Sequence, residues 1–70
     1  MDFGKNFKEA RKQSGYSQKQ VAEKLGIYQS NVSDWENNVS RPEYEKLIEL
    51  AKMYETSLEE LLGVADQFRF

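Results

Sequence analysis

The chain has 70 residues and a formal net charge of −2, and it contains no cysteine and no histidine. This composition excludes disulfides, thiolate nucleophiles and the usual zinc or haem ligands, so we expect no cofactor and no bound metal. A domain this small buries only about 60% of the surface that its unfolded chain exposes, which leaves no room for an enzymatic cleft with a lid. No apolar run approaches the length of a membrane span, and we expect a cytoplasmic protein that is not secreted.

Charge is distributed unevenly along the chain. Residues 1–41 hold seven Lys or Arg against five Asp or Glu, a net +2, whereas residues 42–70 hold three against seven, a net −4. The negative total argues mildly against a nucleic-acid partner. An anionic partner should nevertheless meet the N-terminal half.

The first predicted helix covers about residues 2–14. Phe3, Phe7 and Ala10 recur at helical spacing and give this segment one apolar face. Gly15 follows at a position where a left-handed residue commonly ends a helix. The pattern therefore predicts an amphipathic helix that ends before Gly15.

The second predicted helix has the clearest start in the chain. Ser17 and Gln20 form a Ser-x-x-Gln capping box, and Tyr16 and Val21 occupy the two positions of a hydrophobic staple. The apolar stripe of this helix consists of Val21, Ala22 and Leu25. Gly26 ends this helix, and only Gly26 and Ile27 precede the next helical segment. So short a turn forces the two helices to cross steeply.

The segment LGIYQSNVSDWEN, residues 25–37, predicts a third helix with an unusual polar side. A helix that starts near Tyr28 places Tyr28, Val32 and Trp35 on one face, which we expect to be core. The other face carries short polar side chains, namely Gln29, Ser30, Ser33, Asp34 and Asn37. A merely solvated face more often carries Lys and Glu, so this face is typical of a contact surface, with an ordinary solvated face as the alternative. Asn38 tolerates the left-handed conformation and can end the helix.

Two further helices are predicted after Pro42. One side of the fourth is lined by Tyr44, Leu47, Ile48, Ala51 and Tyr54. Ser57 and Glu60 form a second capping box ahead of the fifth helix. The apolar side of the fifth helix consists of Leu58, Leu61 and Leu62. No stretch alternates with period two over a strand's length, so the sequence predicts an all-α fold, a compact five-helix bundle.

Three segments of the chain occur in an order and spacing typical of one family: FGKNFKEARKQSGYSQKQVAEKLGIYQSNVSDWE, then RP, then LIELAKMYETSLEELL. Over about residues 3–62 the chain resembles the phage-repressor, Cro-like helix-turn-helix family, also called the xenobiotic-response-element family. The resemblance implies a helix-turn-helix formed by the second and third helices, with the third in the major groove of DNA. The resemblance implies a non-enzymatic transcriptional regulator that binds double-stranded DNA sequence-specifically, as a repressor of phage or bacterial type.

The polar face of the third helix then becomes the reading face. Gln29, Ser30 and Asp34 match the family's usual base-contact positions, and Ser33 is adjacent to them. Gln29 can contact adenine N6 and N7, Asp34 can accept from cytosine N4, and the serines can bond to either kind of base edge.

The resemblance also implies phosphate contacts that flank this face. It places them at Ser17, Gln18, Asn31, Asn37 and Arg41. A helix N-terminus offers unpaired N–H groups and a partial positive charge to an anionic oxygen. Lys19 adds a full charge at the start of the second helix. Tyr28 stands where the family usually has a Ser or Thr cap, and its ring can reach a phosphate or a thymine methyl group.

Arg11 and Glu36 occupy positions that the family joins as an ion pair between helices. We expect this structural role for Glu36, whereas Arg11 can also touch phosphate. Trp35 is expected to be core, because its face points inward.

The family tends to dimerise through its fifth helix and the residues after it, which here implies contacts at Leu58, Leu62, Phe68 and Phe70. We accordingly assign residues 1–63 to a DNA-binding domain and residues 64–70 to a tail, either a dimer contact or a linker. A symmetric homodimer would read a pseudo-palindromic operator with half-sites about 10 base pairs apart.

Besides Tyr28, two further departures from the family pattern bear on function. Asn38 replaces the usual loop glycine, and the third helix contains no Arg or Lys. Because a basic side chain on guanine is the commonest specific contact, the operator should depend on A·T pairs and phosphate geometry. The alternative function is an antitoxin-like module that binds a protein through its acidic fourth and fifth helices, with secondary DNA binding.

Overall fold

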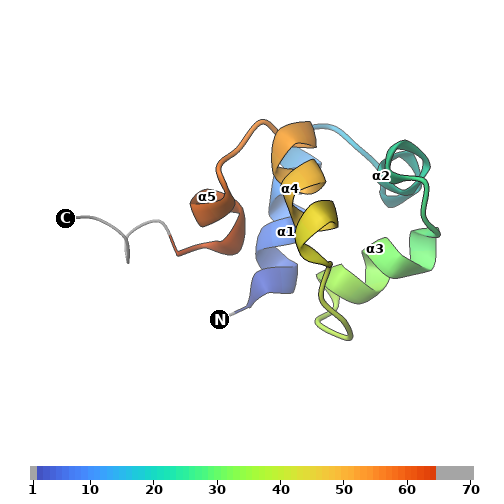
Figure 1. The fold of residues 1–70 in the computed structure, drawn as a ribbon, viewed down its shortest axis with the longest axis horizontal. Helices are drawn as coiled ribbons and strands as arrows, with labels where there is room; N and C mark the ends of the chain where they lie inside the picture. Colours follow the sequence, from blue (N-terminus) through green and yellow to red (C-terminus); the bar gives the residue numbers. More distant parts are fainter. Residues whose placement is uncertain (1, 65–70) are drawn as a thin grey trace.

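The computed structural model of the protein describes residues 2–64, which form five helices and no strand. The helices are α1 (Phe3–Gln13), α2 (Gln18–Leu25), α3 (Gln29–Glu36), α4 (Tyr44–Met53) and α5 (Leu58–Leu62). Figure 1 shows α3 and α5 on opposite sides of α1, with α2 beside α3. The predicted all-α, five-helix fold is therefore confirmed.

Every helix ends in the same way, with a left-handed residue followed by an N–H group that donates to the carbonyl five positions earlier. Val39 N donates to Asp34 O at 2.9 Å, and Thr56 N donates to Ala51 O at 3.0 Å. The left-handed residues are Gly15, Gly26, Asn38, Glu55 and Gly63. The sequence predicted the first three, whereas Glu55 was not predicted, because a glutamate adopts this conformation only at a cost of roughly 1–2 kcal/mol.

Of the two capping boxes that the sequence predicts, the structure contains one in full. Ser17 accepts from Gln20 N at 3.0 Å while Gln20 Oε1 accepts from Ser17 N at 2.9 Å, so the first capping box is confirmed. The second is only half present. Ser57 accepts from Glu60 N at 3.1 Å, but the Glu60 carboxylate accepts from the Thr56 hydroxyl instead of reaching back to Ser57.

The core draws residues from all five helices, and its buried members are Phe7, Val21, Ala22, Leu25, Val32, Trp35, Leu50, Ala51, Tyr54 and Leu61. Tyr16 packs against this cluster, as expected of a staple residue next to Val21. Trp35 is buried, in agreement with the prediction.

Four residues that the sequence places on apolar helix faces are exposed, and the predicted core position of Tyr28 is wrong. Tyr28 is 81% exposed because it is the N-cap of α3, where its extended backbone takes the side chain off the helical progression. Ile27, one residue earlier, packs against the core instead. On α4, the buried stripe centres on Leu50, which leaves Tyr44 and Ile48 exposed beyond its edge. Leu58 is also exposed, so Leu61 is the buried residue of α5.

Gly4 permits a close contact between α1 and the end of α3. A Cβ atom at this position would lie 2.7 Å from the Glu36 carbonyl carbon and would also overlap the carbonyl oxygen. Gly4 is buried, and only a residue without a side chain fits there. This contact fixes how α1 meets the C-terminal end of the helix that carries the polar face.

Candidate nucleic-acid interface

The polar face of α3 is accessible along its whole length. Gln29, Ser30 and Asn31 are exposed, and Ser33 and Asp34 are half-buried. Val32 and Trp35 lie beneath them in the core, and α2 packs against the helix. The residues predicted to contact bases therefore share one outward surface on a helix that is anchored from below.

Glu36 is the centre of a buried polar network at the end of α3. Its Oε2 accepts from Arg11 Nε at 2.7 Å, and its Oε1 accepts from Arg11 Nη2 at 3.0 Å. Both side chains are almost fully buried, with relative exposures of 10% and 3%. The hydrogen bond to Glu36 raises the pKa of Arg11 above its ordinary value. The structure thus brings together the two residues that the resemblance paired.

This network also includes α2. Gln18 Nε2 donates to Glu36 Oε1 at 3.1 Å, and Arg11 Nη1 donates to the Tyr16 carbonyl at 3.0 Å. One carboxylate therefore connects α1, the start of α2 and the end of α3. Because the Arg11 guanidinium compensates the Glu36 charge, that carboxylate adds little repulsion at a surface predicted to meet phosphate.

Most of the predicted phosphate contacts lie at two places. At the start of α2, the Ser17 hydroxyl serves the capping box and the Gln18 side chain is held by Glu36, whereas Lys19 is exposed. The first N–H groups of a helix lack intrahelical partners, so the N-terminus of α2 keeps its attraction for anions.

The second place is the end of α3 and the loop that follows. Asn37 is exposed, and its Nδ2 donates to Ser33 Oγ at 3.2 Å. Arg41 is exposed, and its guanidinium lies 5.4 Å from the centre of the Phe3 ring. Tyr28 lies at the opposite end of α3, where it is the N-cap residue. Its side chain makes no cap hydrogen bond, so the first N–H groups of α3 have no side-chain cap.

Of the residues predicted at a dimer contact, two belong to α5. Leu58 is 37% exposed, and Leu62 packs partly against the core. Phe68 and Phe70 lie outside the described residues. Figure 1 shows α5 on the side of α1 opposite to α3, which separates any contact made by Leu58 from the polar face.

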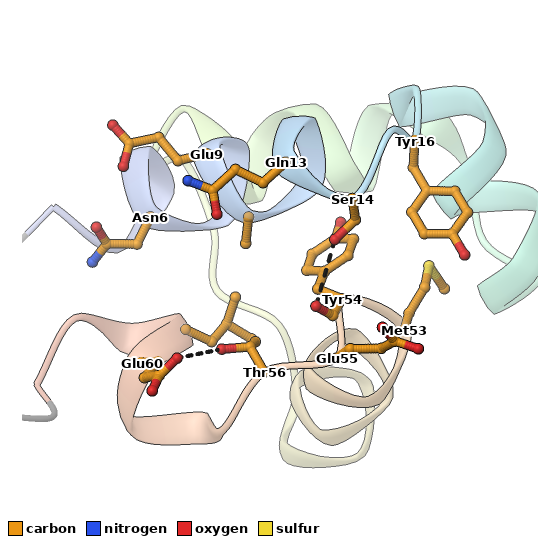
Figure 2. A pocket seen from close by; sticks show the side chains of 12 residues that line it. Asn6, Glu9, Gln13, Ser14, Tyr16, Met53, Tyr54, Glu55, Thr56 and Glu60 are labelled. Carbon is orange, nitrogen blue, oxygen red and sulfur yellow. Dashed lines mark hydrogen bonds between the residues drawn. The ribbon is translucent and has the colours of Figure 1, made fainter.

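An open groove of about 710 Å³ lies between α1 and the segment that joins α4 to α5. Figure 2 shows its polar lining, in which Glu9 projects from α1 and Glu55 and Glu60 lie across the groove. This acidic groove includes none of the residues predicted to contact DNA.

Two sets of contacts were missed by sequence reasoning. Gln18 was expected to face phosphate, and its bond to Glu36 was not foreseen. Asn38 was judged only by its backbone, although its side chain bonds to Gly4 and Asp2 at the start of α1. The replacement of a loop glycine by a residue with an amide was the available signal.

Within residues 2–64, no helix is long and apolar enough to cross a membrane. The same residues contain no group of three or more acidic side chains arranged to hold a metal ion.

Two short helices joined by a tight turn, with a polar face on the second, define a helix-turn-helix domain. The chain belongs to the helix-turn-helix family, which matches residues 7–61 and confirms the predicted resemblance. It is 43% identical over 63 residues to the HTH-type transcriptional regulator ImmR of Bacillus subtilis strain 168, covering 90% of this chain and 50% of ImmR. It is 38% identical over 55 residues to the HTH-type transcriptional regulator AnsR of the same organism, covering 79% of this chain and 47% of AnsR. The chain thus spans about half the length of these relatives.

Proposed function

We propose that this chain binds double-stranded DNA sequence-specifically in the cytoplasm as a transcriptional regulator of the repressor type. The observation that carries this proposal is the exposed polar face of α3, held at a fixed angle by the network around Glu36. In the proposed complex α3 enters the major groove. The names of ImmR and AnsR, both HTH-type transcriptional regulators, support the same assignment.

We assign base contacts to the polar face of α3 and phosphate contacts to residues on either side of it. Gln29, Ser30, Ser33 and Asp34 read base edges, because their short polar groups match the donors and acceptors of the major groove. Phosphates are contacted on either side by Ser17, Gln18, Lys19, Tyr28, Asn31, Asn37 and Arg41. Phosphate contacts fix the register of the protein on the duplex but carry no sequence information directly.

Selection of binding sites from random duplex DNA tests the function. The wild-type protein should enrich a defined motif dominated by A·T pairs. The variant Gln29→Ala with Ser30→Ala, which removes two exposed polar groups, should lose that motif while its fold stays intact. The variant Glu45→Ala with Glu49→Ala on α4 is the matched control and should keep it. Equal recovery of all sequences by the wild type would contradict the proposal.

We further propose that two copies act as a symmetric homodimer on a pseudo-palindromic operator. A twofold axis would place the two reading helices about 34 Å apart, in successive major grooves on one side of the duplex. The proposed contact consists of Leu58 and Leu62 on α5 and the tail residues Phe68 and Phe70. Sedimentation with the selected site should show a two-to-one complex that Phe68→Ser with Phe70→Ser weakens. One monomer saturating one asymmetric site would contradict the dimer.

A second candidate function is supported by the acidic groove. An antitoxin-like module would use the carboxylates of Glu9, Glu55 and Glu60 to bind a basic protein partner. Purification of the protein from its native cells distinguishes the two functions. A stable stoichiometric protein complex, together with failure of the DNA selection, would favour this alternative.

A further inference from the structure

The loop between α3 and α4 is tied to the start of α1 by the side chain of Asn38. Asn38 Oδ1 accepts from Gly4 N at 2.9 Å, and Asn38 Nδ2 donates to Asp2 Oδ1 at 2.9 Å. The same Asp2 oxygen accepts from Lys5 N at 2.9 Å. The side-chain amide of Asn38 therefore uses both its donor and its acceptor to bond to the start of α1, more than thirty positions earlier in the chain.

The bonds to Asp2 have an electrostatic counterpart. The hydrogen bond from Asn38, followed by that from Lys5 N, lowers the pKa of Asp2 below its usual range. Asp2 is ionised at neutral pH even at its ordinary pKa, so its bond from Asn38 is charge-assisted, and such hydrogen bonds are stronger than neutral ones.

Arg41, in the same loop, also contacts the start of α1. Its guanidinium lies over the Phe3 ring at 5.4 Å, within the range of a cation–π interaction. Gly4 meanwhile lets the Glu36 carbonyl approach the helix backbone. Residues 2, 3 and 4 consequently contact the chain at residues 38, 41 and 36, so the start of α1 contacts both the end of α3 and the loop that carries an exposed arginine.

We propose that Asn38 is a positioning residue for DNA binding, which fixes the α3–α4 loop on the start of α1 so that Arg41, stacked on Phe3, is presented to a DNA phosphate. This inference rests on the proposed function. Arg41 is a long side chain in an exposed loop, and immobilising such a side chain opposes binding. A loop that is already fixed before DNA arrives reduces that entropic cost.

The left-handed backbone alone does not account for an asparagine here. Asn38 has a φ of 61°, a conformation that glycine adopts with less strain. Glycine, however, has no side chain to bond to Gly4 and Asp2. The amide of Asn38 is therefore the feature that distinguishes this loop from one that merely turns.

The test uses Asn38→Gly, which keeps the backbone conformation and removes both side-chain hydrogen bonds. Affinity for the selected operator should fall by about 3- to 10-fold, the effect of releasing one flexible side chain. The slope of log affinity against log salt concentration should become shallower by about one, because one phosphate contact is lost. Ser40→Gly, which adds a glycine to the same loop and leaves the Asn38 bonds intact, is the matched control and should change neither quantity.

A double-mutant cycle with Arg41→Ala separates positioning from a general loss of structure. If Asn38 acts through Arg41, Asn38→Gly should have little further effect on affinity in the Arg41→Ala background. Phe3→Leu, which removes the ring but keeps an apolar side chain, should give the same pattern. Hydrogen exchange on the free protein provides a readout without DNA, since the Gly4 amide should exchange faster in Asn38→Gly than in wild type.

The outcomes distinguish this inference from the function on which it rests. Equal losses from Asn38→Gly with and without Arg41, or an unchanged salt slope, would overturn the positioning role while the DNA-binding function stands. A wild-type protein that selects no DNA motif would overturn both.

Discussion

Glu36 accepts two hydrogen bonds from Arg11, at 2.7 and 3.0 Å, across 25 positions of sequence. The pair is buried, and the same carboxylate accepts a third bond from Gln18. This one carboxylate joins α1, the start of α2 and the end of α3. The stability of the fold and the orientation of α3 therefore both depend on Glu36.

Neutralising this carboxylate should strongly destabilise the fold. Glu36→Gln leaves the Arg11 charge buried without a compensating charge, and we expect the free energy of unfolding to fall by about 3–5 kcal/mol. Denaturant titration measures it. Glu23→Gln, an exposed position on α2, is the control and should unfold near the wild-type midpoint. A wild-type midpoint for Glu36→Gln would mean that the pair contributes little.

A methyl group at Gly4 should also be destabilising. In most helices alanine is the better residue, but here Gly4→Ala forces the new Cβ against the Glu36 backbone. We expect a loss of about 1–3 kcal/mol, typical of overpacking against atoms that cannot rotate away. Thermal and denaturant unfolding of Gly4→Ala and of Lys8→Ala, an exposed α1 position, would measure the difference. Gain of stability in Gly4→Ala would show that α1 can move away from α3.

Tyr54 should make the fold sensitive to alkaline pH. Burial, followed by the negative charge of Glu36, raises the pKa of Tyr54 well above its ordinary value of 10.0. A raised pKa in the folded state means that the stabilisation is fully present below about pH 10 and is lost as the pH rises further. One such group contributes a slope of at most about 1.4 kcal/mol per pH unit.

Unfolding free energies measured below and above pH 10 test this dependence. The alkaline loss should be smaller in Tyr54→Phe than in wild type, because phenylalanine has no proton to release. Tyr44→Phe, at an exposed position, should behave as wild type does. Parallel curves for Tyr54→Phe and wild type would contradict the prediction.

Base contact and phosphate contact should be separable by two substitutions. Gln29→Ala should cost roughly 1–3 kcal/mol of binding and relax the preference at one base pair. Arg41→Ala should weaken binding to all sequences alike and make the salt dependence shallower by about one. Competition binding on single-base operator variants measures both. Uniform weakening by Gln29→Ala would remove its assignment as a base contact.

The sequence alone determined the helices, their order and most of their ends. Capping residues and left-handed stops act over three or four neighbouring positions, so Ser17, Gly15 and Gly26 could be interpreted without knowledge of the rest of the fold. The polar face of α3 was likewise visible, because helical spacing alone separates Gln29 and Ser30 from Val32 and Trp35.

Only the tertiary structure decided which groups meet across the bundle. The bonds of Gln18 to Glu36 and of Asn38 to Asp2, and the contact of Gly4 with Glu36, join positions 18 or more residues apart. Likewise, Tyr28 and Tyr44 look like core residues in a periodic pattern, but burial depends on whether another element covers the position. Local periodicity specifies which face of a helix is apolar, whereas the packing of distant segments determines where that face is covered and which side chains are left to contact a partner.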